Sequence, residues 1–304
     1  ARDRAEAAVE ARSAFMANMS HEIRTPMNGV LGFTDVLLTG ELTEQQRRQV
    51  EMIAESGRAM LRLLNDILDM SKIEAGQMTY APGDVDLHHV LNSVARMLQP
   101  SAEAKEIELD IFVSPSLPPQ IVTDPLRFRQ ILLNLLNNAI KFTNQGHVHI
   151  AAHRHEDDGQ SFLKVSIEDS GIGMVADRLE AIFAPFMQAE IDTSQRFGGT
   201  GLGLSISQEL ARLLGGEISV VSEQGVGTTF TLTLPLTAAD TVRVAPKVAE
   251  SNIEDLRLTD VRILVAEDND INQQLMRDMA VTLGIEIEIA SDGEQAIEAV
   301  RQAA

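Results

Sequence analysis

The chain has 304 residues, 44% of them hydrophobic, and its 45 acidic and 25 basic residues give a formal charge of −20. This length predicts two or three domains, and the acidity disfavours binding to nucleic acids or anionic membranes, which both need a cationic surface. The absence of cysteine excludes disulfides and thiolate chemistry, and no apolar run reaches the ~20 residues of a membrane span, so we expect a cytoplasmic location for this region, with or without a membrane-anchored segment upstream.

Residues 1–76 predict a helical hairpin. One helix is expected over 2–38, and Thr43 with Gln46 forms a capping box for a second helix that ends at Gly76. Apolar residues recur at steps of three, four or seven: Met16, Ile23, Met27, Val30 and Leu37 in the first helix, and Ile53, Gly57, Met60, Leu64 and Ile67 in the second. Because one hairpin cannot cover its own stripe, we expect two to form a dimeric four-helix bundle.

Residues 77–84 are expected to be a linker, and residues 85–236 alternate between helix and strand patterns. Helices are predicted at 86–99, 125–141 and 203–214, and strands at 106–113, 147–153, 162–168, 216–222 and 227–235. The last two strands flank a glycine-containing turn and should form a hairpin. We expect this domain to be a two-layer α/β sandwich.

Residues 237–259 are polar and are expected to be a second linker. Residues 260–304 then begin a βαβα pattern, with strands at 262–266 and 285–289 and helices at 271–283 and 292–303. These residues are too few for a covered parallel sheet, so we expect the N-terminal part of a truncated, flavodoxin-like domain. The predicted fold class is therefore multidomain, α plus α/β.

His21 is the first candidate for chemistry. On a helical wheel it lies about 160° from the stripe residue Ile23, with Thr25 one turn further along the same face. An imidazole that is neutral at pH 7 is a usable nucleophile, and the neighbouring carboxylate of Glu22 could accept its proton. By itself, however, this pattern is more often that of an ordinary surface histidine on a helix.

The sequence around His21 favours the chemical role. The string from Phe15 to Gly29, FMANMSHEIRTPMNG, resembles the phosphoacceptor H-box of histidine kinases. The resemblance implies that His21 accepts a phosphoryl group, that Glu22 assists its deprotonation, and that Thr25 supports phosphatase activity.

Three further segments together predict a nucleotide pocket. Asn134, Asn138 and Lys141 share one face of a predicted helix, where an amide oxygen could bind Mg²⁺ and the lysine a phosphate. Asp169 ends a strand and precedes Gly171 and Gly173, which would let the backbone approach an adenine base. The glycine-rich segment 196–205 opens a helix, where backbone N–H groups could hold phosphates. Taken singly, the three could be a polar helix face, a β-turn and a flexible loop.

In this order the segments resemble the N, G1 and G2 boxes of the ATPase superfamily that histidine kinases share with type II topoisomerases, mismatch-repair ATPases and a heat-shock chaperone. Segment 181–188 resembles the F-box between them, although Ala184 stands where an acidic residue is common. The resemblance assigns Mg²⁺ to Asn138, adenine to Asp169, and a mobile lid over ATP to about 184–200. The residues it implies around the nucleotide are Asn134, Asn138, Lys141, Asp169, Gly171, Gly173, Phe183, Phe186, Gly199, Thr200, Gly201, Leu202 and Gly203.

Paired acids follow the strand predicted near the C-terminus. The segment 265–272, VAEDNDIN, resembles the start of a response-regulator receiver, in which Glu267 and Asp268 would bind Mg²⁺. The acceptor aspartate of such a domain follows a third strand, which lies beyond residue 304. An acidic helix N-terminus is the simpler alternative for these residues.

The whole sequence resembles a hybrid sensor histidine kinase. The expected function is ATP-dependent autophosphorylation of His21, relay to a receiver aspartate in cis or to a response regulator or phosphotransfer protein in trans, and possible reverse phosphatase activity. The expected cofactors are ATP and Mg²⁺, and the expected assembly is a homodimer. A non-catalytic sensory scaffold and an ATP-driven conformational clamp are the alternatives.

Overall fold

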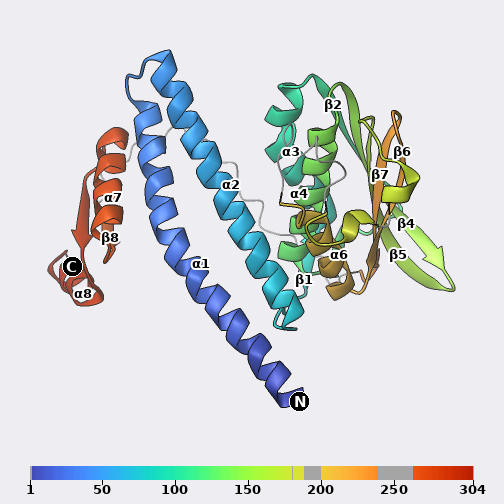
Figure 1. Cartoon of the computed structure of the whole chain (residues 1–304), viewed down its shortest axis with the longest axis horizontal. Helices are drawn as coiled ribbons and strands as arrows, with labels where there is room; N and C mark the ends of the chain where they lie inside the picture. Colours follow the sequence, from blue (N-terminus) through green and yellow to red (C-terminus); the bar gives the residue numbers. More distant parts are fainter. Residues whose placement is uncertain (1, 180, 188–199, 239–262, 304) are drawn as a thin grey trace. The chain divides into compact units, whose positions relative to one another are not determined.

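The computed structural model describes residues 2–179, 181–187, 200–238 and 263–303 (Figure 1). It divides into two compact units: residues 1–68 with 245–304, and residues 69–244. Within the described helices, nothing is described of the side chains of residues 2–18, 21, 270, 271, 279, 282, 283 and 303. No helix in the described ranges combines the length and the apolar character that crossing a bilayer requires.

The first unit contains the predicted hairpin, built from α1 (Arg2–Thr39) and α2 (Glu44–Glu74). The capping box at the start of α2 is confirmed. The amide of Thr43 donates to Oε1 of Gln46 at 3.0 Å, and the amide of Gln46 donates to Oγ1 of Thr43 at 3.3 Å. After α2, Gly76 adopts a left-handed conformation (φ 63°), which turns the chain away from the helix axis.

The apolar stripe predicted on α2 is only partly buried against α1. Gly57 and Leu64 are buried, and a Cβ on Gly57 would lie 2.9 Å from Cδ2 of Leu31 on α1, so α1 and α2 pack closely there. Ile53 and Met60, from the same predicted stripe, are each 51% exposed. On α1, Ile23, Val30 and Leu37 are also exposed. The hairpin therefore leaves one apolar edge uncovered.

The C-terminal residues of this unit form the predicted βαβα order. The elements are β8 (Ile263–Ala266), α7 (Asp270–Leu283), β9 (Ile287–Ala290) and α8 (Gly293–Ala303). Strands β8 and β9 pair in parallel, with Ile263 opposite Ile287. A parallel pair joined by a helix is the beginning of an α/β layer.

The second unit is the predicted two-layer sandwich (Figure 1). Its five-stranded sheet has the order β2-β4-β5-β7-β6, in which only β2 and β4 are parallel. Helices α3, α4 and α6 cover one face of this sheet. The elements are α3 (Leu87–Glu103), β2 (Ile107–Val113), α4 (Pro125–Phe142), β4 (Gly146–Asp157), β5 (Gln160–Asp169), η1 (Ala176–Arg178), η2 (Ala181–Phe183), α6 (Gly203–Leu213), β6 (Glu217–Glu223) and β7 (Gly227–Pro235).

The core lies between the helices and the sheet. Alternate residues of β5 face it, and Leu163, Val165 and Ile167 are almost completely buried. Long apolar side chains of α3 and α4 fill the other side, with Leu91, Phe128, Ile131, Leu132, Leu135 and Leu136 at 1% exposure or less. Helix α4 is thus rigidly packed along most of its length.

A second, two-stranded sheet was not expected from the sequence. Strand β1 (Gly83–Asp86) begins in the predicted linker, and it pairs antiparallel with β3 (Gln120–Thr123). On its other edge β3 contacts the residues that follow β7, because the amide of Val122 donates to the carbonyl of Thr237 at 2.9 Å. Strand β3 leads directly into α4. The first strand of the domain and the residues after its last strand therefore both pair with the segment that precedes this helix.

Candidate functional site

Helix α4 presents the predicted Asn134, Asn138 and Lys141 on one face. The helix begins at Pro125, and Oδ1 of the buried N-cap residue Asp124 accepts hydrogen bonds from the next two free amides, those of Leu126 and Arg127, at 3.0 and 3.1 Å. Asn134 and Asn138 are both half-buried. The N-cap and the apolar packing together fix the direction in which these polar side chains point.

Asn134 joins α4 to α6. Its amide nitrogen donates to Oγ of the buried Ser207 at 2.8 Å, and its amide oxygen lies against Gly203, the first residue of α6. A side chain at position 203 would collide with this amide. The predicted Asn134 and Gly203 are therefore brought together, while Ser207, which completes the junction, was not identified from the sequence.

Asp169 ends β5 in a buried position, with only 6% of its surface exposed. Burial raises the pKa of its carboxyl group to about 6, although hydrogen bonds from the Gly171 and Thr228 amides partly oppose the shift. The Gly171 amide lies 2.9 Å from Oδ1. A buried carboxylate at the end of a strand can accept a hydrogen bond from an exocyclic amine such as that of adenine.

The loop after Asp169 packs on the C-terminal end of α4. A Cβ on Gly171 would lie 2.6 Å from the carbonyl oxygen of Phe142, and the amide of Ile172 donates to the same oxygen at 3.3 Å. Gly173 has a φ of 61°, and a Cβ there would overlap the carbonyl group of Glu223. Both predicted glycines thus allow backbone contacts that a side chain would prevent.

Lys141 lies in the last turn of α4, next to this loop. Its side chain is half-buried, and burial lowers the pKa of its ammonium group below the ordinary value. Nζ lies 4.7 Å from the centroid of the Phe142 ring. Asn134 and Lys141 therefore reach this region from α4, and Asp169 reaches it from the end of β5.

The glycine-rich segment is described from Thr200 onward. Oγ1 of Thr200 accepts a hydrogen bond from the amide of the fully buried Leu202 at 3.1 Å. The carbonyl of Gly201 (φ 70°) accepts one from the amide of Phe186 at 3.0 Å, which joins the two ends of the predicted lid. Gly199 and residues 188–198 lie outside the described residues.

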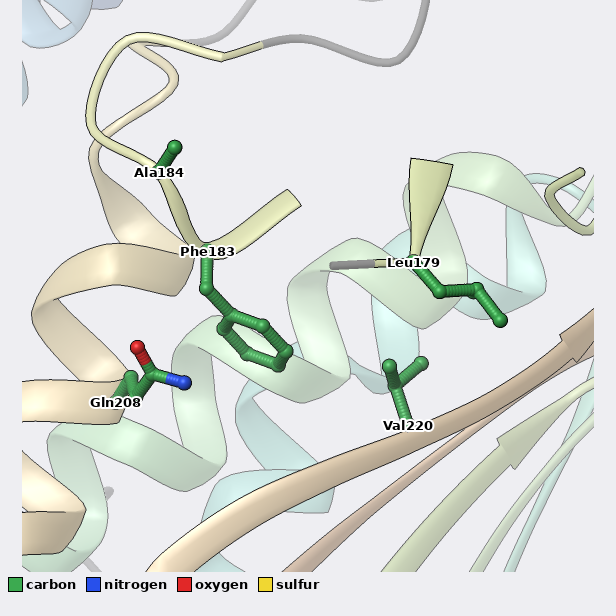
Figure 2. Close-up of a pocket in the computed structure, with 5 residues that line it drawn as sticks. All are labelled: Leu179, Phe183, Ala184, Gln208 and Val220. Carbon is green, nitrogen blue, oxygen red and sulfur yellow. The ribbon is translucent and has the colours of Figure 1, made fainter. Parts of the chain in front are cut away.

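Phe183 lines a hollow of about 540 Å³ with Leu179, Ala184, Gln208 and Val220. Figure 2 shows its ring pointing into this space, with Gln208 on one side and Val220 on the other. The ring also packs edge-on against Phe230 of β7, with centroids 6.5 Å apart. Phe183 therefore packs against the sheet and α6, whereas Phe186 is 69% exposed at the base of the lid.

The predicted phosphoacceptor segment lies in α1. Glu22 and Thr25 are exposed, Ser20 is buried, and the side chain of His21 falls outside the description. Nη2 of Arg24 donates to Oδ1 of Asn65 at 3.1 Å, which ties this part of α1 to α2.

Glu267 and Asp268 follow β8, as predicted. The amide of Asn269 donates to Oε1 of Glu267 at 3.1 Å, and hydrogen bonds from the Asn272 side chain and this amide hold the pKa of Glu267 below its ordinary value. Asp268 is exposed. Two carboxylates therefore follow the carboxyl end of β8 directly.

No cluster of three or more His, Cys, Asp or Glu side chains suited to a metal occurs in the described part of the chain. A cation near Asn138 would therefore take most of its ligands from a nucleotide and from water. Mg²⁺ binds in this way, since it keeps several waters and needs few protein ligands. The amide of Asn138 fits such a nucleotide-held ion.

Two family models match the chain. Residues 11–76 match the His Kinase A (phospho-acceptor) domain, and residues 123–238 match the histidine kinase-, DNA gyrase B- and HSP90-like ATPase. A phosphoacceptor hairpin followed by an ATPase domain of this type defines a protein-histidine kinase.

The curated relatives of the chain include sensor kinases. The chain is 37% identical over 302 residues to the autoinducer 2 sensor kinase/phosphatase LuxQ of Vibrio parahaemolyticus, covering 98% of this chain and 35% of LuxQ. It is 39% identical over 303 residues to sensor protein TorS of Escherichia coli (99% and 32%), and 43% identical over 233 residues to hybrid signal transduction histidine kinase B of Dictyostelium discoideum (76% and 12%). The chain belongs to the hybrid sensor histidine kinases.

A solved structure supports the same family. ShkA, full-length and in complex with AMPPNP, is 34% identical and superposes with a TM-score of 0.63, covering 94% of this chain and 57% of ShkA. The chain spans about a third of the length of LuxQ and of TorS.

Proposed function

We propose that this protein uses ATP to phosphorylate its own His21 and so starts a two-component phosphorelay. One observation carries the proposal. Three segments far apart in sequence meet at α4: Asn134 is joined to the start of α6, and the loop after Asp169 packs on the end of the same helix. A nucleotide site assembled in this way needs no cationic surface, which suits a chain of charge −20.

We assign the domains as follows. Residues 1–76 form the dimerisation and phosphotransfer hairpin, 85–236 the catalytic ATP-binding domain, and 260–304 the first part of a receiver. Residues 77–84 and 237–259 connect them. Residues 83 and 84 belong structurally to β1, so the first linker is ordered at its end.

Within the catalytic domain, Asp169 accepts a hydrogen bond from the adenine amino group, and Gly171 and Gly173 let the backbone reach the base. Asn138 binds Mg²⁺, which neutralises charge on the phosphates when bound. Lys141 contacts a phosphate oxygen. Asn134 holds α6 in place, so that the segment from Gly199 to Gly203 presents its N–H groups to the phosphates. Phe183 and Phe186 anchor the lid.

In the reaction, an imidazole nitrogen of His21 forms a bond to the γ-phosphorus while the bond from that phosphorus to the β–γ bridging oxygen breaks, so that ADP leaves. Glu22 accepts the proton of the other ring nitrogen. Transfer of this kind depends on positioning and charge neutralisation more than on covalent assistance by the enzyme.

We assign the uncovered edge of the hairpin to a homodimer. Ile23, Val30 and Leu37 on α1, with Ile53 and Met60 on α2, are exposed in a single chain. A second hairpin that covers this edge would complete a four-helix bundle, as expected for a phosphoacceptor domain of this family.

The phosphoryl group of His21 then passes to a receiver aspartate, in cis or on a response regulator or phosphotransfer protein in trans. Glu267 and Asp268 bind Mg²⁺ in the cis receiver. Thr25 supports the reverse, phosphatase activity, and the name of LuxQ as a kinase/phosphatase is consistent with such a dual role.

A single-turnover experiment separates this function from its alternatives. The wild type, incubated with ATP labelled in the γ-phosphate, should release one ADP for each phosphoryl group that it retains. Normal ATP binding with no phosphohistidine would favour a sensory scaffold. Steady ATP hydrolysis that persists in His21→Ala would favour a conformational clamp.

A further inference from the structure

Lys105 lies outside every segment identified from the sequence, in the turn between α3 and β2. Its Nζ donates hydrogen bonds to three main-chain carbonyls: those of Ile140 at 2.8 Å, Lys141 at 2.9 Å and Thr143 at 3.1 Å. These residues form the last turn of α4 and its C-cap. One ammonium group therefore uses all three of its donors on the end of the helix that carries the N-box.

The turn that holds Lys105 is well defined. The amide of Lys105 donates to the carbonyl of Ala102, and that of Glu106 to the carbonyl of Glu103, each at 3.0 Å. Glu106 has a φ of 57°, so the chain leaves α3 through a left-handed residue before β2 begins. Burial lowers the pKa of the Lys105 ammonium below its ordinary value, as expected for a cation that is partly removed from water.

The final carbonyls of α4 are fully accounted for. The amide and hydroxyl of Thr143 both donate to the carbonyl of Ala139, at 3.1 and 2.8 Å. The carbonyl of Phe142 accepts from the amide of Ile172, and Lys105 takes the remaining three. Carbonyls at a helix C-terminus have no partners within the helix and carry partial negative charge, so a cation is favourable there.

Lys105 and the loop that follows Asp169 contact neighbouring carbonyls of the same short stretch of backbone, residues 140–143. Phe142, whose carbonyl meets Gly171 and Ile172, lies between two of the carbonyls that Lys105 holds. Asn138 is only one turn earlier on α4, and Lys141 is within the stretch itself. The placement of the Mg²⁺ and phosphate ligands relative to the adenine-binding Asp169 is thus set at this junction.

We propose that Lys105 is a positioning residue for the nucleotide site, which holds Asn138 and Lys141 at the correct distance from the G1 loop. This inference rests on the proposed function. It predicts a specific defect. Without the three hydrogen bonds of Lys105, the nucleotide should still bind through its base, whereas the additional affinity that Mg²⁺ provides through Asn138 should be lost.

The test compares Kd for ATP in Mg²⁺ and in EDTA, well below the unfolding temperature, using the whole chain. Lys105→Met keeps the length of the side chain and removes its donors. We expect its Kd in Mg²⁺ to rise about tenfold, the usual effect of losing an outer support of a ligand residue, with a much smaller change in EDTA. Lys105→Arg, which can donate to the same carbonyls, should restore most of the affinity.

Lys164→Met is the matched control, because the buried Leu163 and Val165 on either side place Lys164 on the face of β5 away from α4. If Lys105→Met lowers the unfolding temperature but keeps the wild-type Kd ratio, the residue is only structural and the proposal is overturned. If Lys105→Met does not fold, Lys105→Gln is measured against the same criterion. A wild type whose ATP affinity does not respond to Mg²⁺ would instead contradict the proposed function.

Discussion

The amide oxygen of Asn134 on α4 lies directly against the α-carbon of Gly203 at the start of α6, in the space that a Cβ would occupy. The other end of the same amide donates to Ser207, one turn along α6. A single side chain therefore spaces the N-box helix from the glycine-rich helix, and the lack of a side chain at position 203 is what allows the two to approach.

Gly203→Ala should separate the two helices. Fitting a methyl group into this contact costs about 1–3 kcal/mol, so we expect a folded but less stable protein whose ATP affinity is at least about tenfold lower. Isothermal titration with ATP and a thermal melt measure the two effects. Gly83→Ala is the control, because a Cβ there meets only Cδ of Pro125 at 3.9 Å, and it should bind ATP normally.

ATP affinity should fall in mild acid. The carboxyl group of Asp169 has a pKa of about 6, and only its ionised form accepts a full-strength hydrogen bond from adenine. From about pH 7 to about pH 5 the ionised fraction falls roughly tenfold, and affinity should fall in proportion. Titrations at matched ionic strength measure this. Asp169→Asn should bind weakly with little pH dependence, and an equally steep dependence in that variant would exclude Asp169 as the titrating group.

The raised pKa of Asp169 also predicts that Asp169→Asn, which should bind ATP weakly, is more stable than the wild type. Between its ordinary pKa of 3.8 and about 6, the empty folded domain holds a proton on Asp169 that the unfolded chain has released. The contribution of this group to the unfolding free energy therefore decreases as pH rises through that window. At about pH 8, Asp169→Asn should melt at least about 2 °C above the wild type, with the difference vanishing below about pH 4. A lower melting temperature for the variant at pH 8 would contradict this.

Charge on the uncovered edge of the hairpin should abolish dimerisation. Met60→Glu places a carboxylate within the proposed interface, where it would be buried without a partner, at a cost of several kcal/mol. Light scattering during size exclusion should show a monomer. Arg62→Glu, on an exposed position about 200° around the helix from Met60, should stay dimeric. A Met60→Glu protein that remains dimeric would remove this edge from the interface.

Local signals in the sequence predicted most of the helices and strands. The Thr43–Gln46 box begins α2 because both of its hydrogen bonds join residues three positions apart. Strand β1 was taken for linker, since its pairing with β3 joins residues 34 to 40 positions apart and both strands have only four residues. Division of the α2 stripe into a buried and an exposed edge depends on where α1 lies, which periodicity alone does not reveal.

In the candidate site, too, only the residues that carry a local signal could be predicted from the sequence. Asn134 and Lys141 could be placed on one face of a helix by spacing, but the partner of Asn134, Ser207, lies 73 residues away and looks like any helix serine. Lys105 carried no signal, because a lysine in a turn is ordinarily solvated. The proposed role of Lys105 rests on the three carbonyls that accept its hydrogen bonds. Residues that bind a ligand through a short motif are readable from sequence, whereas those that position the motif are found through contacts between distant segments.

Transfer of the γ-phosphoryl group of ATP to His21 is the most direct test of the account. Protein incubated with γ-labelled ATP is denatured and treated with acid or alkali, and the label is counted. The wild type and the control His155→Ala, which changes an exposed histidine of β4, should both carry a label that is lost in acid and stable in alkali. His21→Ala should bind ATP normally and carry none, whereas equal labelling of His21→Ala would show that His21 is not the acceptor.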